Sequence, residues 1–199
     1  MKEFLVVLKS CGYDAYFVKD KAEALSLAKS YIKPNMSVGL GGSESVKEIG
    51  LLDFLLENKE ITLHNQYEAG ISMEENIKRR KQGLISDIFV TSTNAITKDG
   101  KLVNADGSGN RVAALSYGPT NVLLIVGINK IVDSLEDGFK RVMDVAATKN
   151  IDRMNKKAIS FGKEAKYNLD NIARKFTWIK GDDEIGRIII ILVDEELGY

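Results

Sequence analysis

Short apolar runs and amphipathic segments alternate along the chain, and this alternation predicts its elements. Apolar runs, or apolar and polar residues in alternation, predict strands at 13–18, 37–40, 61–63, 86–91, 112–116 and 122–126. Apolar residues at helical spacing predict helices at 1–10, 20–32, 73–82 and 134–147, and a capping box at Ser45–Glu48 marks another helix start. Strands that alternate with helices favour an α/β fold, with a mostly parallel sheet covered on both faces.

The last part of the chain departs from this alternation. Lys175–Ile179 and Arg187–Val193 read as two strands around the polar turn Gly181–Asp183, which predicts a C-terminal β-hairpin. Ile188–Val193 is apolar throughout, so burial on both faces is expected, and Trp178 is expected in the core. No linker, repeat or low-complexity tract divides the 199 residues, so we expect a single domain.

Composition excludes several classes of protein. The 28 Lys and Arg residues equal the 28 Asp and Glu residues, which is not the basic balance of a nucleic-acid binder. The basic cluster Arg79–Lys81 is interpreted as a solvated helix end. No apolar run approaches the ~18 residues of a membrane span, and no cleavage site follows the N-terminal apolar patch. We therefore expect a cytoplasmic protein without membrane or nucleic-acid partners.

The chain has one cysteine, Cys11, and one histidine, His64. A single cysteine excludes an intramolecular disulfide and a cysteine-based cluster within one chain. With one histidine, neither a His-based metal site nor a Ser-His-Asp triad is expected, and His64 is interpreted as structural or surface-exposed. We predict no metal site and no cofactor.

The glycine-rich loop Gly39–Ser45 joins a predicted strand to a helix start. Glycines let a ligand approach the backbone, and N–H groups at a helix start favour an anion. The spacing fits neither a dinucleotide fingerprint nor a P-loop. Glu44 either points away from the ligand or acts as an acid/base group, and an ordinary capped turn is the structural alternative. The candidate ligands of a phosphate or carboxylate are Gly41, Gly42, Ser43 and Ser45.

Residues 91–111 are polar and glycine-rich, and they lie between two apolar runs, where α/β proteins often hold ligands. Arg111 is a candidate bidentate clamp for an anion, and Asp99 and Asp106 are candidate acid/base carboxylates. Each aspartate precedes a glycine, so turn formation is the alternative for both. A long solvated hairpin loop is the alternative for the whole segment. The candidate amide ligands are Asn94, Asn104 and Asn110.

Lys130 follows the predicted strand 122–126 and could reach an anion from the same edge of the sheet; a surface lysine is the alternative. Loops at the carboxyl ends of parallel strands share one edge. We therefore expect loops 39–45 and 91–111, far apart in the chain, to line a single cleft with positive potential.

Ten segments match a known family in order: Ser37–Ser43, Glu48–Leu51, Thr91–Thr97, Asp99–Gly100, Leu102–Asn104, Gly109–Ala114, Gly118–Pro119, Gly127, Asn129–Val132 and Glu196–Tyr199. Together they resemble the LUD domain. This is the lactate-utilization protein family, here its short stand-alone branch related to lactate-utilization protein C and the YkgG proteins. The resemblance implies a three-layer α/β/α fold like that of the NagB, RpiA and CoA-transferase superfamily. It also matches Gly41–Ser43 to an anion-holding loop, and Asp99, Gly100 and Asn104 to an Asp-Gly-x-Val-Asn loop.

The resemblance also implies a genetic context. In bacteria the family is associated with an operon whose products oxidise L-lactate to pyruvate through iron–sulfur partner proteins. Two features depart from the family. Many relatives of the short branch carry several cysteines before the terminal strands, whereas 161–167 and the residues after it have none. If those cysteines bind a metal or a cluster in relatives, this chain has lost that capacity. Glu44–Ser45 also replaces a small or apolar residue followed by Thr.

Three functions compete at this point. The first is a non-redox enzyme or binding protein for a small anionic metabolite, either a hydroxy or keto acid or a sugar phosphate. The second is a non-catalytic subunit of an iron–sulfur complex that oxidises L-lactate. An NAD-dependent dehydrogenase is least favoured, because the glycine spacing and the acidic ribose contact are missing. Relatives in the superfamily often dimerise, so a homodimer is expected.

Overall fold

Six parallel strands form the main sheet of the computed structural model, which describes residues 1–160 and 162–199. The strand order is β1-β10-β7-β4-β2-β3, and every neighbouring pair is parallel. The start of the cysteine-free stretch, residue 161, lies outside the described residues. The bounds of the strands are β1 Asp14–Val18, β2 Ser37–Leu40, β3 Thr62–His64, β4 Ile88–Thr91, β7 Asn121–Gly127 and β10 Ile188–Val193.

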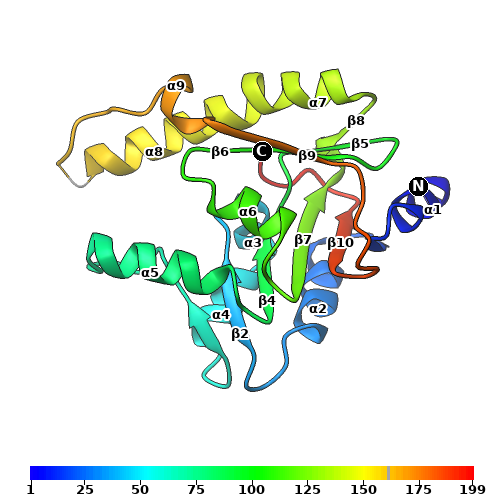
Figure 1. The fold of residues 1–199 in the computed structure, drawn as a ribbon, viewed down its shortest axis with the longest axis horizontal. Coiled ribbons are helices and arrows are strands. Elements are labelled where there is room, and N and C mark those ends of the chain that lie inside the picture. The colour runs from blue at the N-terminus through cyan, green and yellow to red at the C-terminus, as the bar shows by residue number, and fades with distance from the viewer. Residues whose placement is uncertain (161) are drawn as a thin grey trace.

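Helices cover both faces of this sheet (Figure 1). On one face pack α2 (Lys21–Ser30), α3 (Glu44–Glu48) and α4 (Leu51–Glu57). On the other face lie α1 (Lys2–Ser10), α5 (Met73–Gly83) and α6 (Asn110–Ser116). The predicted three-layer α/β/α fold with a mostly parallel sheet is therefore confirmed.

A second sheet and a long helix lie across the carboxyl ends of the main strands (Figure 1). The sheet has the order β8-β5-β6-β9. The helix runs from α7 through a π-helical segment, η2, into α8, and ends well beyond the predicted boundary at residue 147. The bounds are β5 Ala95–Thr97, β6 Leu102–Asp106, β8 Ile131–Val132, β9 Lys175–Ile179, η1 Ile128–Lys130, α7 Leu135–Arg141, η2 Val142–Ala147, α8 Thr148–Ser160 and α9 Leu169–Ile172.

Strand β10 is buried on both faces, as predicted. Ile188 and Ile190 pack into one apolar cluster, and Ile189 and Ile191 pack into the other. The predicted C-terminal hairpin is wrong, because β10 lies between β1 and β7 while β9 pairs antiparallel with β6 in the other sheet. An all-apolar strand needs neighbours on both edges and cover on both faces, which a hairpin with the partly exposed β9 would not supply. Trp178 of β9 is 49% exposed, so its predicted place in the core is also wrong.

Residues 112–116 form part of helix α6, where a strand was predicted. Gly109, with φ of 95°, turns the chain into the helix. The Asp106 carboxylate then accepts hydrogen bonds from the backbone N–H groups of Arg111 and Val112, both at 2.9 Å. Such side-chain acceptors satisfy the unpaired N–H groups of a first helical turn. The apolar run is thus one face of a helix.

The segment 91–111 is not a long solvated loop. It contains β5 and β6, which pair as a hairpin around the turn at Asp99 and Gly100, followed by the start of α6. The predicted capping box is also displaced: the cap of α3 is Ser43, whose Oγ accepts from the N–H of Val46 at 3.2 Å. Ser45 lies inside that helix and is fully buried.

Within the described ranges, no helix is both long enough and apolar enough to cross a lipid bilayer.

Candidate functional site

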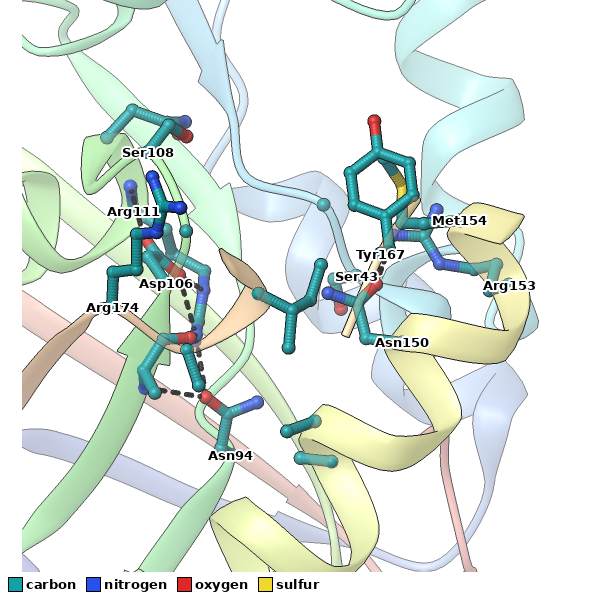
Figure 2. Close-up of a pocket in the computed structure, with 18 of the residues that line it drawn as sticks. Ser43, Asn94, Asp106, Ser108, Arg111, Asn150, Arg153, Met154, Tyr167 and Arg174 are labelled. Atoms are coloured by element: carbon teal, nitrogen blue, oxygen red, sulfur yellow. Dashed lines mark hydrogen bonds and ion pairs between the residues drawn. The ribbon is translucent and has the colours of Figure 1, made fainter. Parts of the chain in front are cut away.

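A cleft of about 720 Å³ opens between the carboxyl ends of the main strands and the long helix. Ser43 contributes from the β2–α3 loop, Asn94 from the loop before β5, and Asp106 from the end of β6. Asn150 and Arg153 contribute from α8. Figure 2 shows Asn94, Asp106 and Arg111 on one side of the cleft and the α8 residues on the other. A cavity of this size suits a small ligand.

The structure brings most of the predicted site residues together. Ser43 of loop 39–45 and Arg111 of segment 91–111 line the same cavity, as expected for a single cleft. Gly41, Ser45 and Asn104 are buried and are not among the residues that line the cleft. The predicted residues that line it are Gly42, Ser43, Glu44, Asn94, Asp106, Asn110, Arg111 and Lys130.

Asp99 does not line the cleft. It lies at the β5–β6 turn, where its carboxylate is paired with Lys101 and accepts a hydrogen bond from Thr97. These two contacts lower its pKa. The turn interpretation therefore describes Asp99 correctly, and the proposal that it acts as an acid/base group in this cleft is wrong.

Arg111 holds the site together and does not offer a free clamp. Its Nε donates to Asp106 Oδ1 at 3.0 Å. One terminal nitrogen donates to the Ser92 carbonyl at 3.1 Å and to Asn104 Oδ1 at 2.5 Å. The other donates to Asn94 Oδ1 at 2.7 Å and to the Ala105 carbonyl at 2.9 Å. All five guanidinium N–H groups thus have protein acceptors, so the predicted bidentate clamp is wrong.

The two carboxylates that line the cleft are already engaged. Asp106 is paired with Arg111 and caps α6. Glu44 is paired with Lys47 at 2.9 Å and lies 3.7 Å from the Nε of Arg153. Their negative charges are therefore compensated by Arg111, Lys47 and Arg153. They do not neutralise the other basic side chains that line the cleft.

The three predicted amide ligands have different positions. Asn104 is fully buried, and its Oδ1 accepts from the Asn94 N–H at 3.1 Å as well as from Arg111. Asn94 uses its own Oδ1 to accept from Arg111 and from the Ala105 N–H, which leaves its amide N–H₂ on the cleft side. Asn110 lies at the cleft and accepts from the Ser108 hydroxyl at 2.9 Å. Asn94 and Asn110 are thus the two that a ligand could touch.

Lys130 is a buried base at the floor of the cleft, 2% exposed, and not a surface lysine. Its Nζ donates to the hydroxyl oxygens of Ser45 and Ser92, each at 2.9 Å. Burial, and then the nearby positive charges of Arg141 and Arg111, lower the pKa of Lys130 to about 7. Groups with such perturbed pKa values cluster at functional sites.

Four basic side chains of the cleft were not predicted from the sequence. Of the predicted solvated helix end, only Lys81 is exposed, whereas the Arg79 side chain is 21% exposed and paired with two glutamates. Arg80 of the same cluster lines the cleft, and its Nε is buried without a hydrogen-bond partner among the described residues. The mixed charge of this helix was the one sequence feature that could have indicated a cation facing inward at Arg80. The four residues are Arg80, Arg153, Lys166 and Arg174.

The π-helical segment η2 forms part of the cleft wall through Val142, Ala146 and Ala147. A π-helical turn inside an α-helix is rare and occurs mostly at functional sites. In the part of the chain that the structure describes, no group of three or more His, Cys, Asp or Glu side chains is placed to hold a metal ion.

Fold and cleft together define a three-layer α/β/α protein with a basic cleft at the carboxyl ends of its parallel strands. The LUD domain model matches residues 1–193, and the chain therefore belongs to the LUD domain family. No curated protein matches the chain.

A DUF162 family protein from Deinococcus radiodurans has a similar structure, with 16% identity and a TM-score of 0.51. The match covers 96% of this chain and 94% of that one, and it supports the fold. Ribose 5-phosphate isomerase from Plasmodium falciparum is 16% identical, with a TM-score of 0.36 and coverage of 71% and 67%. A D-ribose-5-phosphate isomerase in complex with phospho-erythronic acid is 14% identical, with a TM-score of 0.40 and coverage of 87% and 94%.

Proposed function

We propose that this LUD domain protein binds a small organic anion in the cleft and serves lactate utilization. The ligand class we favour is a hydroxy or keto acid, because the family is named for lactate utilization. A sugar phosphate carries the same kind of charge and is the competing ligand. Several bases of the cleft could hold the anionic group, and the amides of Asn94 and Asn110 are placed to bind its hydroxyl or carbonyl oxygens.

One observation carries this proposal. Both acidic side chains of the cleft are paired, whereas Arg80, Lys130 and Arg174 line it without an ion pair among the described residues. Lys166 completes this set. Lys130 is buried and Arg80 is partly buried, so positive charge on these two side chains is costly without a protein counter-ion, and a bound anion would remove that cost. Arg174 and Lys166 are exposed and add positive charge to the cleft at little such cost.

The test is isothermal titration calorimetry with L-lactate, pyruvate and ribose 5-phosphate on matched arginine variants. Arg80→Ala removes the guanidinium that lacks a partner for its Nε, and the loss of one charged hydrogen bond of about 1.5–3 kcal/mol should weaken binding roughly tenfold or more. Arg79→Ala is the control, because Arg79 is paired with Glu68 and Glu75. Its affinity should equal that of the unaltered protein.

Two results would contradict the proposed binding function. One is the absence of binding of all three anions at millimolar concentration. The other is equal binding by the Arg80→Ala variant and the unaltered protein, which would place the anion outside this cleft. A preference among the three ligands would identify the substrate class.

A second candidate function is a non-catalytic subunit of a lactate-oxidising assembly whose iron–sulfur proteins are separate chains. The observation that favours it is strand β9, which ends the second sheet and leaves Phe176 39% and Trp178 49% exposed. An exposed edge strand with aromatic side chains can pair with another chain. Co-purification of an iron–sulfur protein with the tagged chain would support this function. A homodimer as the sole species in sedimentation would contradict it.

A further inference from the structure

Lys130 has a hydrogen-bonding arrangement that leaves one position of its amine open. Ser92 Oγ donates to the Ile125 carbonyl at 2.6 Å, and Ser45 Oγ donates to the Leu197 carbonyl at 3.2 Å. Each hydroxyl hydrogen is therefore engaged, and each serine oxygen accepts from Lys130. Two of the three positions around Nζ are thus directed to the serines. The third has no hydrogen-bond partner among the described residues, and Lys130 is one of the residues that line the cleft.

No carboxylate neutralises this amine among the described residues. The charged groups around it are Arg111 of α6, Arg141 of α7 and Glu48 of α3, and only Glu48 favours the ammonium form. Glu48 itself accepts from the Gly198 N–H at 3.0 Å. A lysine that is desolvated and placed beside other cations is the environment in which proteins activate the amine as a nucleophile.

We propose that Lys130 Nζ forms an imine with the carbonyl carbon of a 2-keto acid held in the cleft. This inference rests on the proposed function, since the same basic side chains would bind the carboxylate. It goes further by naming a nucleophile and by selecting ligands that carry a ketone or an aldehyde next to an anionic group.

The step balances without any other reactant. The lone pair of the neutral amine attacks the carbonyl carbon, and the carbonyl oxygen takes up a proton and becomes the hydroxyl of a carbinolamine. That hydroxyl leaves as water when nitrogen forms its second bond to carbon. Both amine hydrogens leave in the water molecule. The hydrogen bonds from Nζ to the Ser45 and Ser92 hydroxyl oxygens, each 2.9 Å long, hold the amine in place for the attack.

Burial and the two arginines support the chemistry by keeping the amine available. They lower the pKa of Lys130 to about 7, so about half of the amine is neutral at that pH, against a very small fraction for an ordinary lysine. The rate of imine formation should therefore rise with pH and reach half of its maximum near pH 7.

The test is reductive trapping of the full-length protein with pyruvate and sodium borohydride, followed by intact mass spectrometry and peptide mapping. We expect one reduced pyruvate adduct per chain, located on Lys130. L-Lactate, which has no carbonyl to attack, should protect Lys130 without labelling it. Lys130→Met should abolish the adduct. Lys140→Met, which removes an exposed lysine of α7, should leave it unchanged.

Calorimetry on the same sample separates this inference from the proposed function. Pyruvate that binds without forming an adduct would overturn the imine and leave the binding function standing. Neither binding nor trapping would overturn both. Adducts spread over exposed lysines, with Lys130 unlabelled, would also overturn the imine. Should the Lys130→Met variant not fold, peptide mapping of the unaltered protein still identifies the labelled residue.

Discussion

The Nζ atom of Lys130 lies 2.9 Å from the hydroxyl oxygen of Ser45, although 85 positions separate them in the chain. Ser45 follows β2, Ser92 follows β4 and Lys130 follows β7, and these three strands are neighbours in the sheet. Parallel strands deliver the residues after their carboxyl ends to one edge, which is where α/β proteins place ligand sites. The order of the strands thus explains how three distant residues form the floor of the cleft.

The difference in stability between the Lys130→Met variant and the unaltered protein should depend on pH. The pKa of Lys130 is about 7 in the folded chain and near the ordinary 10.5 in the unfolded chain. Between these values the unfolded chain binds more protons, so the stability of the unaltered protein rises with pH. Methionine removes the buried charge and keeps an apolar stem. The variant should therefore be the more stable protein at pH 6, and its advantage should shrink by about 1.4 kcal/mol for each pH unit above 7.

Urea unfolding of both proteins from pH 6 to pH 10 measures this difference, with Lys140→Met as the control whose difference should stay flat. If the free-energy gap between Lys130→Met and the unaltered protein does not change with pH, the amine is not buried as described.

Replacement of Arg111 should destabilise the fold. Arg111→Ala leaves the oxygens of Asp106, Asn94 and Asn104 without their common donor, and breaking such a buried pair costs about 3–5 kcal/mol. Chemical denaturation measures the loss. Arg174→Ala, at an exposed arginine of the same cleft, should change stability by no more than ~0.5 kcal/mol. Similar small effects at both positions would contradict the structural role of Arg111.

Substitutions of Asp99 and Asp106, both predicted from the sequence as acid/base carboxylates, should have different effects. Asp106→Asn removes the charge that pairs with Arg111 and weakens the cap of α6, so a loss of about 3 kcal/mol is expected. Asp99→Asn alters an exposed turn outside the cleft and should leave both stability and ligand affinity nearly unchanged. Thermal unfolding and calorimetry check the pair. A large loss of affinity in Asp99→Asn would restore it as a site residue.

Gly41 and Gly42 should differ in their tolerance of a methyl group. A Cβ at Gly41 would lie 2.3 Å from Thr91 Oγ1 and 2.7 Å from Thr91 Cβ, so the backbone must shift. Gly41→Ala should therefore cost about 1–3 kcal/mol. A Cβ at Gly42 meets the Tyr67 hydroxyl at 2.8 Å, which is the movable end of a side chain. Gly42→Ala should fold normally, and equal melting temperatures for both variants would contradict this contrast.

The sequence predicted the layers and the meeting of the glycine loop with the polar segment, because both follow from strand–helix alternation. It could not distinguish the short apolar run at 112–116 as helix or strand, since periodicity does not separate the two at that length. The signals that favoured a helix were Ala113 and Ala114 and the acceptor Asp106. The hairpin prediction failed for another reason: the polar turn at Gly181–Asp183 shows that the chain turns, but not which sheet each strand joins.

Side-chain roles were less accessible than elements. The five donors of Arg111 suited either an anion or five protein acceptors, and only the arrangement of Asn94, Asn104 and Asp106 around it decides between them. The sequence did not decide between a ligand-binding and a surface position for Lys130, because burial of a lysine depends on the helix and sheet that cover it. Both outcomes result from long-range packing, which no local pattern encodes.

A crystal structure of the protein with saturating pyruvate or L-lactate tests the central claim most directly. We expect the ligand in the cleft between Ser43 and Arg153, with its carboxylate in contact with at least one basic side chain and its second carbon beside Lys130 Nζ. A cleft without ligand under these conditions, or a ligand bound elsewhere on the protein, would contradict the account.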